Sequence, residues 1–388
     1  MGMLKKELVV FGVFLCVVFL LYKYNLNDSN IIACKNLDMT KHFKAAQQPI
    51  NDQYIIPDTS VYSQSSDYNV KTNPLKYTVQ TRQEELDNER YGTKIDKRQN
   101  ITNYCRKHMA KNPFLQRANS RVGLKTQLVY FDFAHSFLFC QMQKVGSSTW
   151  NTILLRIRDI KNVRRYQSEE SELGVVASRK RHFLRDTMYN LPNGFNLSDV
   201  KSRLVAFTFT RHPYSRLVSA YNSKIKTIIK RNDKFFNEDI ARIQNTILSQ
   251  YRKSSSMSDP PYPTPTEFIK YLLDKVSEKG PMSLNPHFQP QYGLCPFCLA
   301  EFDFIGDLEY MKEDIAFLGK TLSISKQVSL TNINENSHSD FIGFMSEKDF
   351  FKSVPQQLIK DLYERVYKPD FELLGYPKPT NYIAMGYS

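Results

Sequence analysis

The chain has 388 residues, 41% of them hydrophobic and 13% aromatic, which supports a substantial core in one large or two smaller domains and excludes global disorder. The formal net charge is +14. Such an excess of cations favours a polyanionic partner: nucleic acid, an acidic polysaccharide or an anionic lipid surface.

The N-terminal segment joins two lysines to an apolar run. Lys5 and Lys6 precede an uninterrupted apolar stretch from Leu8 to Tyr22. Its length, about fifteen residues, is short of the ~20 that a typical bilayer needs. It suits either a secretory signal or an uncleaved signal anchor in a thin membrane, and no small-x-small cleavage site follows it soon. We therefore expect residues 1–7 to be a cytosolic tail and residues 8–22 to be a transmembrane signal anchor.

Residues 23–100 are polar and aperiodic, and are rich in Asn, Asp, Gln, Ser and Thr. This composition is typical of a largely unstructured stem, so the globular part is expected to begin near Ile101. Acceptor sequons for N-linked glycans begin at Asn27, Asn100 and Asn196, which is consistent with a lumenal glycoprotein.

The remaining sequence, residues 101–388, alternates strand and helix patterns. Strands are expected at Leu128–Phe133, Ser136–Met142, Arg203–Thr210 and Phe302–Asp307. Helices are expected after Pro213, over Glu267–Val276, over Leu308–Leu322 and over roughly Val354–Tyr367, and a Pro/Ser-rich loop over Arg252–Thr266. The alternation predicts a single α/β domain with a mainly parallel sheet flanked by helices.

The cysteines do not form a metal-binding pattern. Cys16 lies in the apolar run, and the others are Cys34, Cys105, Cys140, Cys295 and Cys298. Cys295 and Cys298 form the one close pair, and zinc would require a second pair at matched spacing. A redox C-x-x-C pair is an alternative, but structural disulfides are the favoured interpretation in an oxidising compartment. The pairing does not follow from the sequence.

The segment QKVGSSTWN, residues 143–151, follows a strand candidate and opens an expected helix. It is not a Walker A loop, in which the lysine follows the second glycine, because Lys144 precedes Gly146. It nevertheless has the parts of a phosphate cradle: a cation, a glycine, and the hydroxyls of Ser147, Ser148 and Thr149 at a helix N-terminus. An ordinary capped helix beside a solvated lysine is the alternative interpretation.

A second strand-to-helix junction lies in TFTRHPYSRLVSAY, residues 208–221. Arg211 ends the strand, where a guanidinium can bind a phosphate through two parallel hydrogen bonds. Ser219 follows two turns into the helix. Since ligands of open α/β sheets bind beyond the carboxyl ends of strands, Lys144 and Arg211 together predict two phosphate sites for one nucleotide.

KVGSSTW and RHPYSRLVSAY together resemble the Golgi carbohydrate sulfotransferases, in the branch of the chondroitin/dermatan 4-O-sulfotransferases and the HNK-1 sulfotransferase. The resemblance covers residues 101–376 and includes NPHFQPQYGLCPFC and LYERVYKPDFELLGY. It implies a P-loop-like sulfotransferase fold and 3′-phosphoadenosine 5′-phosphosulfate (PAPS) as donor, without a metal. It also implies a role for two groups of residues: Lys144, Val145, Gly146, Ser147, Ser148, Thr149 and Trp150 at the 5′-phosphosulfate, and Arg211 and Ser219 at the 3′-phosphate.

The chain departs from the family pattern at two places. The chondroitin enzymes usually have K-V-A-C-T-N-W in place of K-V-G-S-S-T-W, and H-W in place of His287-Phe288. His287 lies where the family has a histidine, so the resemblance implies that it is the base, with Lys144 as the second catalytic residue. A structural role for His287 remains an alternative. His212, His182, Glu169 and Glu170 are the other candidates.

A basic stretch extends from Arg156 to Arg185 and suits either an acidic glycan chain or a solvated helix face. Together these features predict a Golgi, single-pass type II membrane enzyme that sulfates a glycan, with no nucleic-acid partner. The favoured acceptor is the 4-position of N-acetylgalactosamine in chondroitin/dermatan-type chains. The alternatives are an HNK-1-type glucuronyl 3-O-sulfotransferase, a non-catalytic glycan-binding module, and a P-loop kinase or NTPase, against which the missing Walker A loop argues.

Overall fold

The computed structural model describes residues 74–91, 97–120, 128–158, 202–227, 237–252, 259–329 and 344–379. All of them belong to one compact unit, Val70–Ser388. The predicted tail, anchor and N-terminal part of the stem lie outside these ranges. Among the described helices none is both long and apolar enough to span a bilayer.

Four strands form the sheet at the centre of this unit, in the order β1-β2-β3-β4. They are β1 (Leu128–Asp132), β2 (Phe137–Gln141), β3 (Val205–Thr210) and β4 (Phe304–Asp307). All four agree with the strands expected from the sequence. β1 pairs antiparallel with β2, whereas the β2–β3 and β3–β4 pairs are parallel. The sheet is therefore mixed, and the predicted parallel arrangement holds for β2, β3 and β4.

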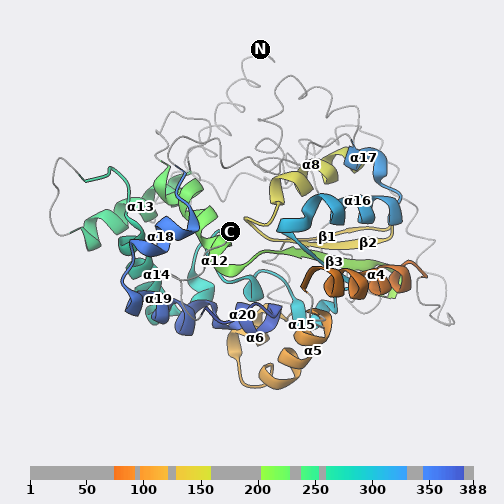
Figure 1. The fold of residues 1–388 in the computed structure, drawn as a ribbon, viewed down its shortest axis with the longest axis horizontal. Helices are drawn as coiled ribbons and strands as arrows, with labels where there is room; N and C mark the ends of the chain where they lie inside the picture. Colours follow the sequence, from red (N-terminus) through yellow and green to blue (C-terminus); the bar gives the residue numbers. More distant parts are fainter. Residues whose placement is uncertain are drawn as a thin grey trace, which may run out of the picture. The chain divides into compact units, whose positions relative to one another are not determined.

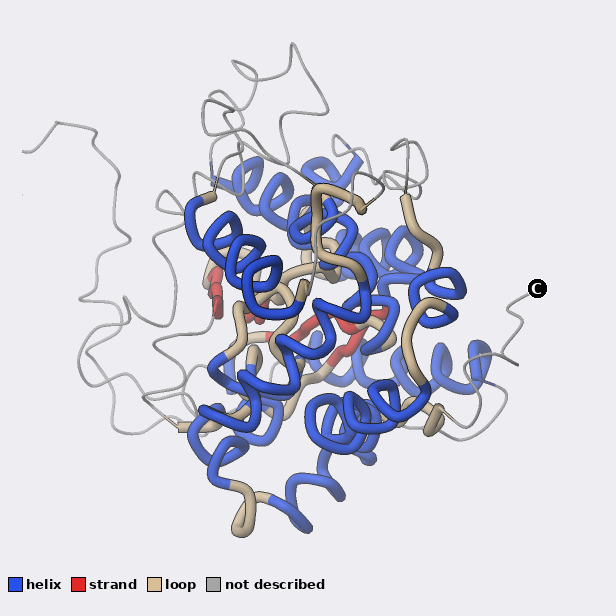
Figure 2. The backbone as a smooth tube through the Cα atoms, turned by 90° about the vertical axis from the view of Figure 1, so that its left-hand side faces the viewer, coloured by secondary structure: helices blue, strands red, loops and turns tan. Residues whose placement is uncertain are grey.

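Helices enclose the sheet. In chain order they are α4 (Pro74–Tyr91), α5 (Lys97–His108), α6 (Pro113–Ala118), α8 (Ser147–Arg158), α12 (Pro213–Ala220), α13 (Glu238–Tyr251), α14 (Pro265–Lys279), α15 (Phe297–Ala300), α16 (Met311–Thr321), α17 (Ser325–Ser329), α18 (Glu347–Lys352), α19 (Gln356–Leu362) and α20 (Lys368–Leu374). π-helical turns extend α12 over Tyr221–Lys226 and α19 over Tyr363–Tyr367. Figure 1 shows α8, α16 and α17 on one side of the sheet and α4, α5 and α15 on the other, and Figure 2 shows the strands surrounded by helix.

β2, β3 and β4 are buried on both faces, which explains why their sequences are near-continuous apolar runs. Every residue of β2, β3 and β4 is buried. Because side chains alternate along a strand, one face of β2 and β3 carries phenylalanines. Trp150 of α8 packs on three of them, with ring centroids 4.7 Å from Phe139, 5.0 Å from Phe207 and 5.4 Å from Phe209.

The folded part begins before Ile101, where the sequence analysis placed its start. Helix α4 lies within the expected stem, yet Val79 is fully buried and Gln83 Oε1 accepts the backbone N–H of Ile305 in β4. Gln83 thus covers the free edge of the sheet. The helix was missed because its surface is strongly polar and only a few positions pack inward.

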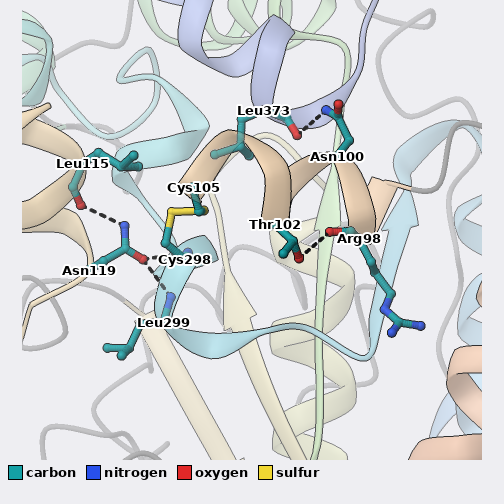
Figure 3. The surroundings of a disulfide bond; sticks show 9 residues. All are labelled: Arg98, Asn100, Thr102, Cys105, Leu115, Asn119, Cys298, Leu299 and Leu373. Atoms are coloured by element: carbon teal, nitrogen blue, oxygen red, sulfur yellow. Dashed lines mark hydrogen bonds between the residues drawn. A yellow bond between two sulfur atoms is a disulfide. The ribbon is translucent and has the colours of Figure 1, made fainter. Parts of the chain in front are cut away.

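Both disulfides of the described region join distant segments. Cys105 in α5 bonds to Cys298 in α15, and Cys140 in β2 bonds to Cys295. This confirms the expected structural disulfides and excludes the redox interpretation of the Cys295–Cys298 pair, since the two cysteines have different partners. Figure 3 shows the Cys105–Cys298 bond beside Asn119, whose Oδ1 accepts the N–H groups of Cys298 and Leu299 at 2.8 and 3.1 Å.

Asn100, the only predicted sequon asparagine among the described residues, has a structural role. Its side-chain amide donates to the carbonyl oxygens of Glu372 at 2.7 Å and Leu373 at 2.9 Å, where α20 ends (Figure 3). These carbonyls have no partner within the helix, so Asn100 caps it.

Candidate functional site

The Lys144 loop lies at the carboxyl end of β2 and leads into α8. Lys144 and Gly146 both have left-handed backbone conformations, with φ of 69° and 76°. A Cβ at Gly146 would collide with the side chain of Met311 in α16. Glycine is favoured there mainly by its backbone conformation, because the colliding atoms are the flexible end of the Met311 side chain. This tight turn is what directs the first N–H groups of α8 and the lysine to one side.

Lys144 is held among cations. Its Nζ donates to Ser223 Oγ at 2.9 Å, and Ser223 in turn donates to the carbonyl of Ser219 at 2.9 Å. Burial, followed by repulsion from Lys224, Arg211 and Arg216, lowers the pKa of Lys144 to about 7. Lys144 therefore lies within electrostatic range of Arg211.

The β3–α12 junction contains two buried polar atoms without hydrogen-bond partners. Arg211 Nε and Ser219 Oγ are both buried and form no hydrogen bond with any described residue. Burial also lowers the pKa of Arg211. A buried donor left unpaired costs about 1–3 kcal/mol, so these two atoms make the junction a candidate binding site.

The backbone of Arg211 is fixed by Gln291. The N–H of Arg211 donates to Gln291 Oε1 at 3.1 Å, and Gln291 Nε2 donates back to the carbonyl of Arg211 at 2.8 Å. The fully buried carboxylate of Asp370 in α20 accepts the N–H groups of Gln291 and Tyr292 at 2.7 and 2.8 Å. Asp370 therefore anchors the segment that orients Arg211.

Arg216, in the first turns of α12, connects the Lys144 loop to the His287 loop. The side chain is 1% exposed. Its three nitrogens donate to the carbonyls of Gln143 at 2.9 Å, Gln289 at 2.7 Å and Pro286 at 2.8 Å. One guanidinium thus binds the carbonyls directly before Lys144 and directly before His287, and so links the two loops that carry the predicted catalytic residues.

His287 lies in this loop with a defined tautomer. Asn285 Oδ1 accepts the backbone N–H of His287 at 3.1 Å, which fixes the orientation of the amide, and lies 2.8 Å from His287 Nδ1. Because an amide oxygen can only accept, Nδ1 carries the proton of the neutral ring. Nε2 then carries the lone pair that a general base requires.

The other predicted residues divide into three groups. Ser147, Ser148 and Thr149 form the first turn of α8 and remain partly or fully exposed. Val145 and Trp150 are 3% and 0% exposed, and Trp150 N donates to the carbonyl of Gly146, so their side chains belong to the core. His182, Glu169, Glu170 and most of the basic stretch lie outside the described residues.

The ring of His212 packs against aromatic side chains. Its ring contacts Phe371 and Tyr376 edge-on, with centroids 5.3 Å apart in both cases. Burial and the neighbouring Arg211 lower the pKa of His212 to about 4, so the ring is neutral at pH 7. We infer that it shapes the Arg211 junction.

Sequence reasoning missed Ser223, Arg216, Gln291 and Asp370. Arg216 lies inside the RHPYSR segment of the second junction, so the sequence could have marked it as a candidate. The three backbone carbonyls that it binds could not be predicted from the sequence. Ser223 lies in the π-helical turn, a local deviation that often accompanies functional sites. Among the described residues no group of three His, Cys, Asp or Glu side chains could hold a metal ion.

A family model described as the sulfotransferase family matches residues 128–377, which include every strand and both junctions. No solved structure matches the chain.

Curated relatives are carbohydrate sulfotransferases of vertebrates. The chain is similar to carbohydrate sulfotransferase 12 of Xenopus laevis (26% identity, 66% of this chain and 61% of the relative) and carbohydrate sulfotransferase 14 of Danio rerio (29%, 63% and 61%). It is also similar to carbohydrate sulfotransferase 11 of Rattus norvegicus (24%, 74% and 77%). The matched region spans about 60% of the length of the first two relatives.

Proposed function

Because the chain belongs to the sulfotransferase family, we propose that it transfers a sulfuryl group from PAPS to a hydroxyl of a glycan. The observation that carries the proposal is the convergence of Lys144, Arg211 and Arg216 at the carboxyl edge of the sheet, where Arg211 Nε and Ser219 Oγ lack partners. A donor with phosphates at both ends of its nucleoside matches two separate anion positions.

The residues present fit such a donor. The first N–H groups of α8, the hydroxyls of Ser147, Ser148 and Thr149, and the ammonium of Lys144 would hold the 5′-phosphosulfate. Arg211 and Ser219 would hold the 3′-phosphate. When bound, PAPS supplies the sulfuryl group to be transferred and a phosphate as its leaving group. The proposal requires no metal.

Lys144 has the chemistry for the leaving side of the reaction. Its pKa of about 7 lets it exchange a proton near neutral pH, and binding of an anion favours its charged form. The ammonium then offsets the negative charge that develops on the leaving phosphate oxygen. In the free protein Ser223 holds Nζ in place.

His287 is proposed as the base. Nε2 accepts the proton of the acceptor hydroxyl while Asn285 Oδ1 stabilises the Nδ1–H side of the imidazolium. Arg216 keeps this loop next to the Lys144 loop, so that base and leaving-group cation are held at a fixed separation.

For the acceptor we propose the 4-hydroxyl of N-acetylgalactosamine in chondroitin/dermatan-type chains. The similarity to carbohydrate sulfotransferases supports a carbohydrate acceptor, and the net charge of +14 suits an acidic chain. The runner-up is a glucuronyl 3-hydroxyl on an HNK-1-type glycan. The proposed location is the Golgi membrane, with residues 8–22 as a type II anchor.

The test is a transfer assay with labelled PAPS and the full chain. The acceptor panel consists of desulfated chondroitin, dermatan, heparan and a glucuronyl-lactosamine glycan, with Lys144→Ala as control. We expect label on chondroitin-type chains that the variant fails to transfer. Binding of PAP (adenosine 3′,5′-bisphosphate) without transfer to any acceptor would favour a non-catalytic glycan-binding module. Thermal stabilisation by ATP and magnesium in place of PAP would favour a kinase or NTPase.

A further inference from the structure

A cavity of about 830 Å³ lies near the amino-terminal ends of β3 and β4. Lys144 and Arg211 lie at the other end of the sheet, after the carboxyl ends of β2 and β3. The wall of the cavity is formed by α4, α5 and α15, by Ser202 before β3, and by Glu301 to Ile305 at the start of β4. None of the predicted donor-site residues lines it. Its volume is within the ~300–1,000 Å³ of small-ligand sites. The cavity is therefore a second candidate site, independent of the first.

The charges in the wall leave an excess of cation. Asp303 is 1% exposed and pairs with Lys76, and its oxygens also accept from Gln80 Nε2 at 2.6 Å and from the N–H of Ala206 at 2.8 Å. This pair is internally neutral. The remaining charged groups of the wall are Arg98, Arg106 and Glu301. Two guanidinium groups thus face one carboxylate.

The two arginines are not neutralised by close carboxylates of the wall. Arg98 Nη1 is buried and forms no hydrogen bond with any described residue, and Glu84 Oε1, which is outside the wall, is 3.9 Å away. Arg106 Nη1 donates to the neutral amide oxygen of Asn103 at 3.3 Å. A buried donor without a partner indicates that the cavity binds an acceptor group.

Arg98, Thr102 and Arg106 form a stripe along α5. Their spacing of four residues places them on one face of the helix, with the guanidinium-bearing residues ~12 Å apart along the axis. Figure 3 shows Arg98 and Thr102 on this helix next to the Cys105–Cys298 bond. Two cations at that separation match a ligand with repeated, spaced anionic groups, and the hydroxyl and amide side chains between them match sugar hydroxyls.

Part of the wall is cross-linked covalently. The Cys105–Cys298 disulfide joins α5 to α15, and Asn119 Oδ1 caps the first turn of α15. Both cysteines line the cavity. A site with a covalently fixed wall loses less conformational entropy on binding.

From these observations we propose that the cavity is an exosite for the acidic acceptor glycan, binding uronate-bearing sugars of a chain whose other end occupies the transfer site. The two sites lie at opposite ends of β3, whose six residues span ~20 Å. Only an acceptor of several sugars can reach both sites. The proposal rests on the proposed function for the identity of the chain, and predicts that long acceptors bind more tightly than short ones because the second contact is intramolecular.

The experiment compares the full chain with the variant Arg98→Gln/Arg106→Gln. The matched control is Lys107→Gln/Arg117→Gln, which removes two exposed cations from α5 and α6 outside the cavity. KM and kcat are measured with desulfated chondroitin polymer and with a chondroitin disaccharide, PAP affinity is measured by calorimetry, and binding of the polymer is measured without donor. We expect the double arginine variant to raise KM for the polymer ~10-fold, with unchanged kcat, disaccharide KM and PAP affinity.

Three outcomes would overturn the exosite: an unchanged polymer KM, an equal rise in KM for both acceptors, or an equal effect of the control variant. Binding of inorganic sulfate without binding of the polymer would also overturn it. If no acceptor is sulfated, the proposed function fails, but donor-free polymer binding still decides the exosite. Loss of that binding in the arginine variant alone would support it.

Discussion

Two sets of buried or partly buried cations in this protein differ in their partners. Lysines of the N-terminal helices pair with aspartates at the two ends of β4: Lys76 with Asp303 and Lys97 with Asp307. The cations at the carboxyl ends of β2 and β3 donate to neutral oxygens instead. Lys144 holds a serine hydroxyl, Arg216 holds three carbonyls, and Arg211 Nε has no partner among the described residues.

This difference in partners distinguishes cations with a structural role from cations that are candidates for ligand binding. An ion pair that is complete in the free protein attaches α4 and α5 to the sheet and leaves no charge for a ligand. Burial and repulsion from the neighbouring cations lower the pKa of Lys144, and this cost is offset when an anion binds. Substitutions in either set of cations test this distinction.

The largest expected effect comes from Lys97→Met. The substitution leaves Asp307, which is 1% exposed, without its cation, and breaking a buried pair typically costs ~3–5 kcal/mol. Chemical denaturation measures the loss in the free energy of unfolding. The exposed pair Arg242–Asp239 provides the control, since Arg242→Ala should cost under ~1 kcal/mol. Equal losses in both variants would contradict the structural role of Lys97.

Lys144→Gln should reduce kcat ~10²–10³-fold, the usual effect of removing one charge-stabilising group. The same variant should be more stable, because it removes a cation from a cluster of cations. A gain of ~1 kcal/mol corresponds to a Tm rise of ~2–4 °C. Lys348→Gln, at an exposed position of α18, should change neither. A lower Tm for Lys144→Gln would mean that the lysine stabilises the free protein.

Arg216→Lys keeps the charge but cannot hold all three carbonyls. The loops carrying Lys144 and His287 should then separate, and kcat should fall ~10–100-fold, as expected for a displacement of about 1 Å. Because Arg211 is fixed separately through Gln291, PAP affinity should fall much less than kcat. Equal losses in both quantities would show that Arg216 acts on the donor site itself.

The smallest expected effect is on pH dependence. The charged fraction of Lys144 in the free protein falls as pH rises through about 7, and the charged form binds the anion. PAP affinity should therefore weaken ~10-fold between pH 7 and pH 8 to 8.5 from this residue alone. Lys144→Arg stays cationic throughout, so the ratio of the two affinities isolates the contribution of Lys144. A constant ratio would contradict the lowered pKa.

The sequence by itself determined the four strands, the two strand-to-helix junctions and the presence of structural disulfides. These features depend on local properties: apolar runs for strands buried on both faces, the glycine in the loop before α8, and Pro213 in the first turn of α12. Each can be recognised within about ten residues.

Only the tertiary structure decided which residues meet. Pairing of Cys105 with Cys298 spans 193 residues, and Arg216 donates to carbonyls 70 and 73 residues away in both directions along the chain. Helix α4 was missed because its few inward residues are fixed by partners just before β3 and β4 and within β4, rather than by its own apolar pattern. Backbone carbonyls carry no sequence signal, so a site built on them is visible only once the chain has folded.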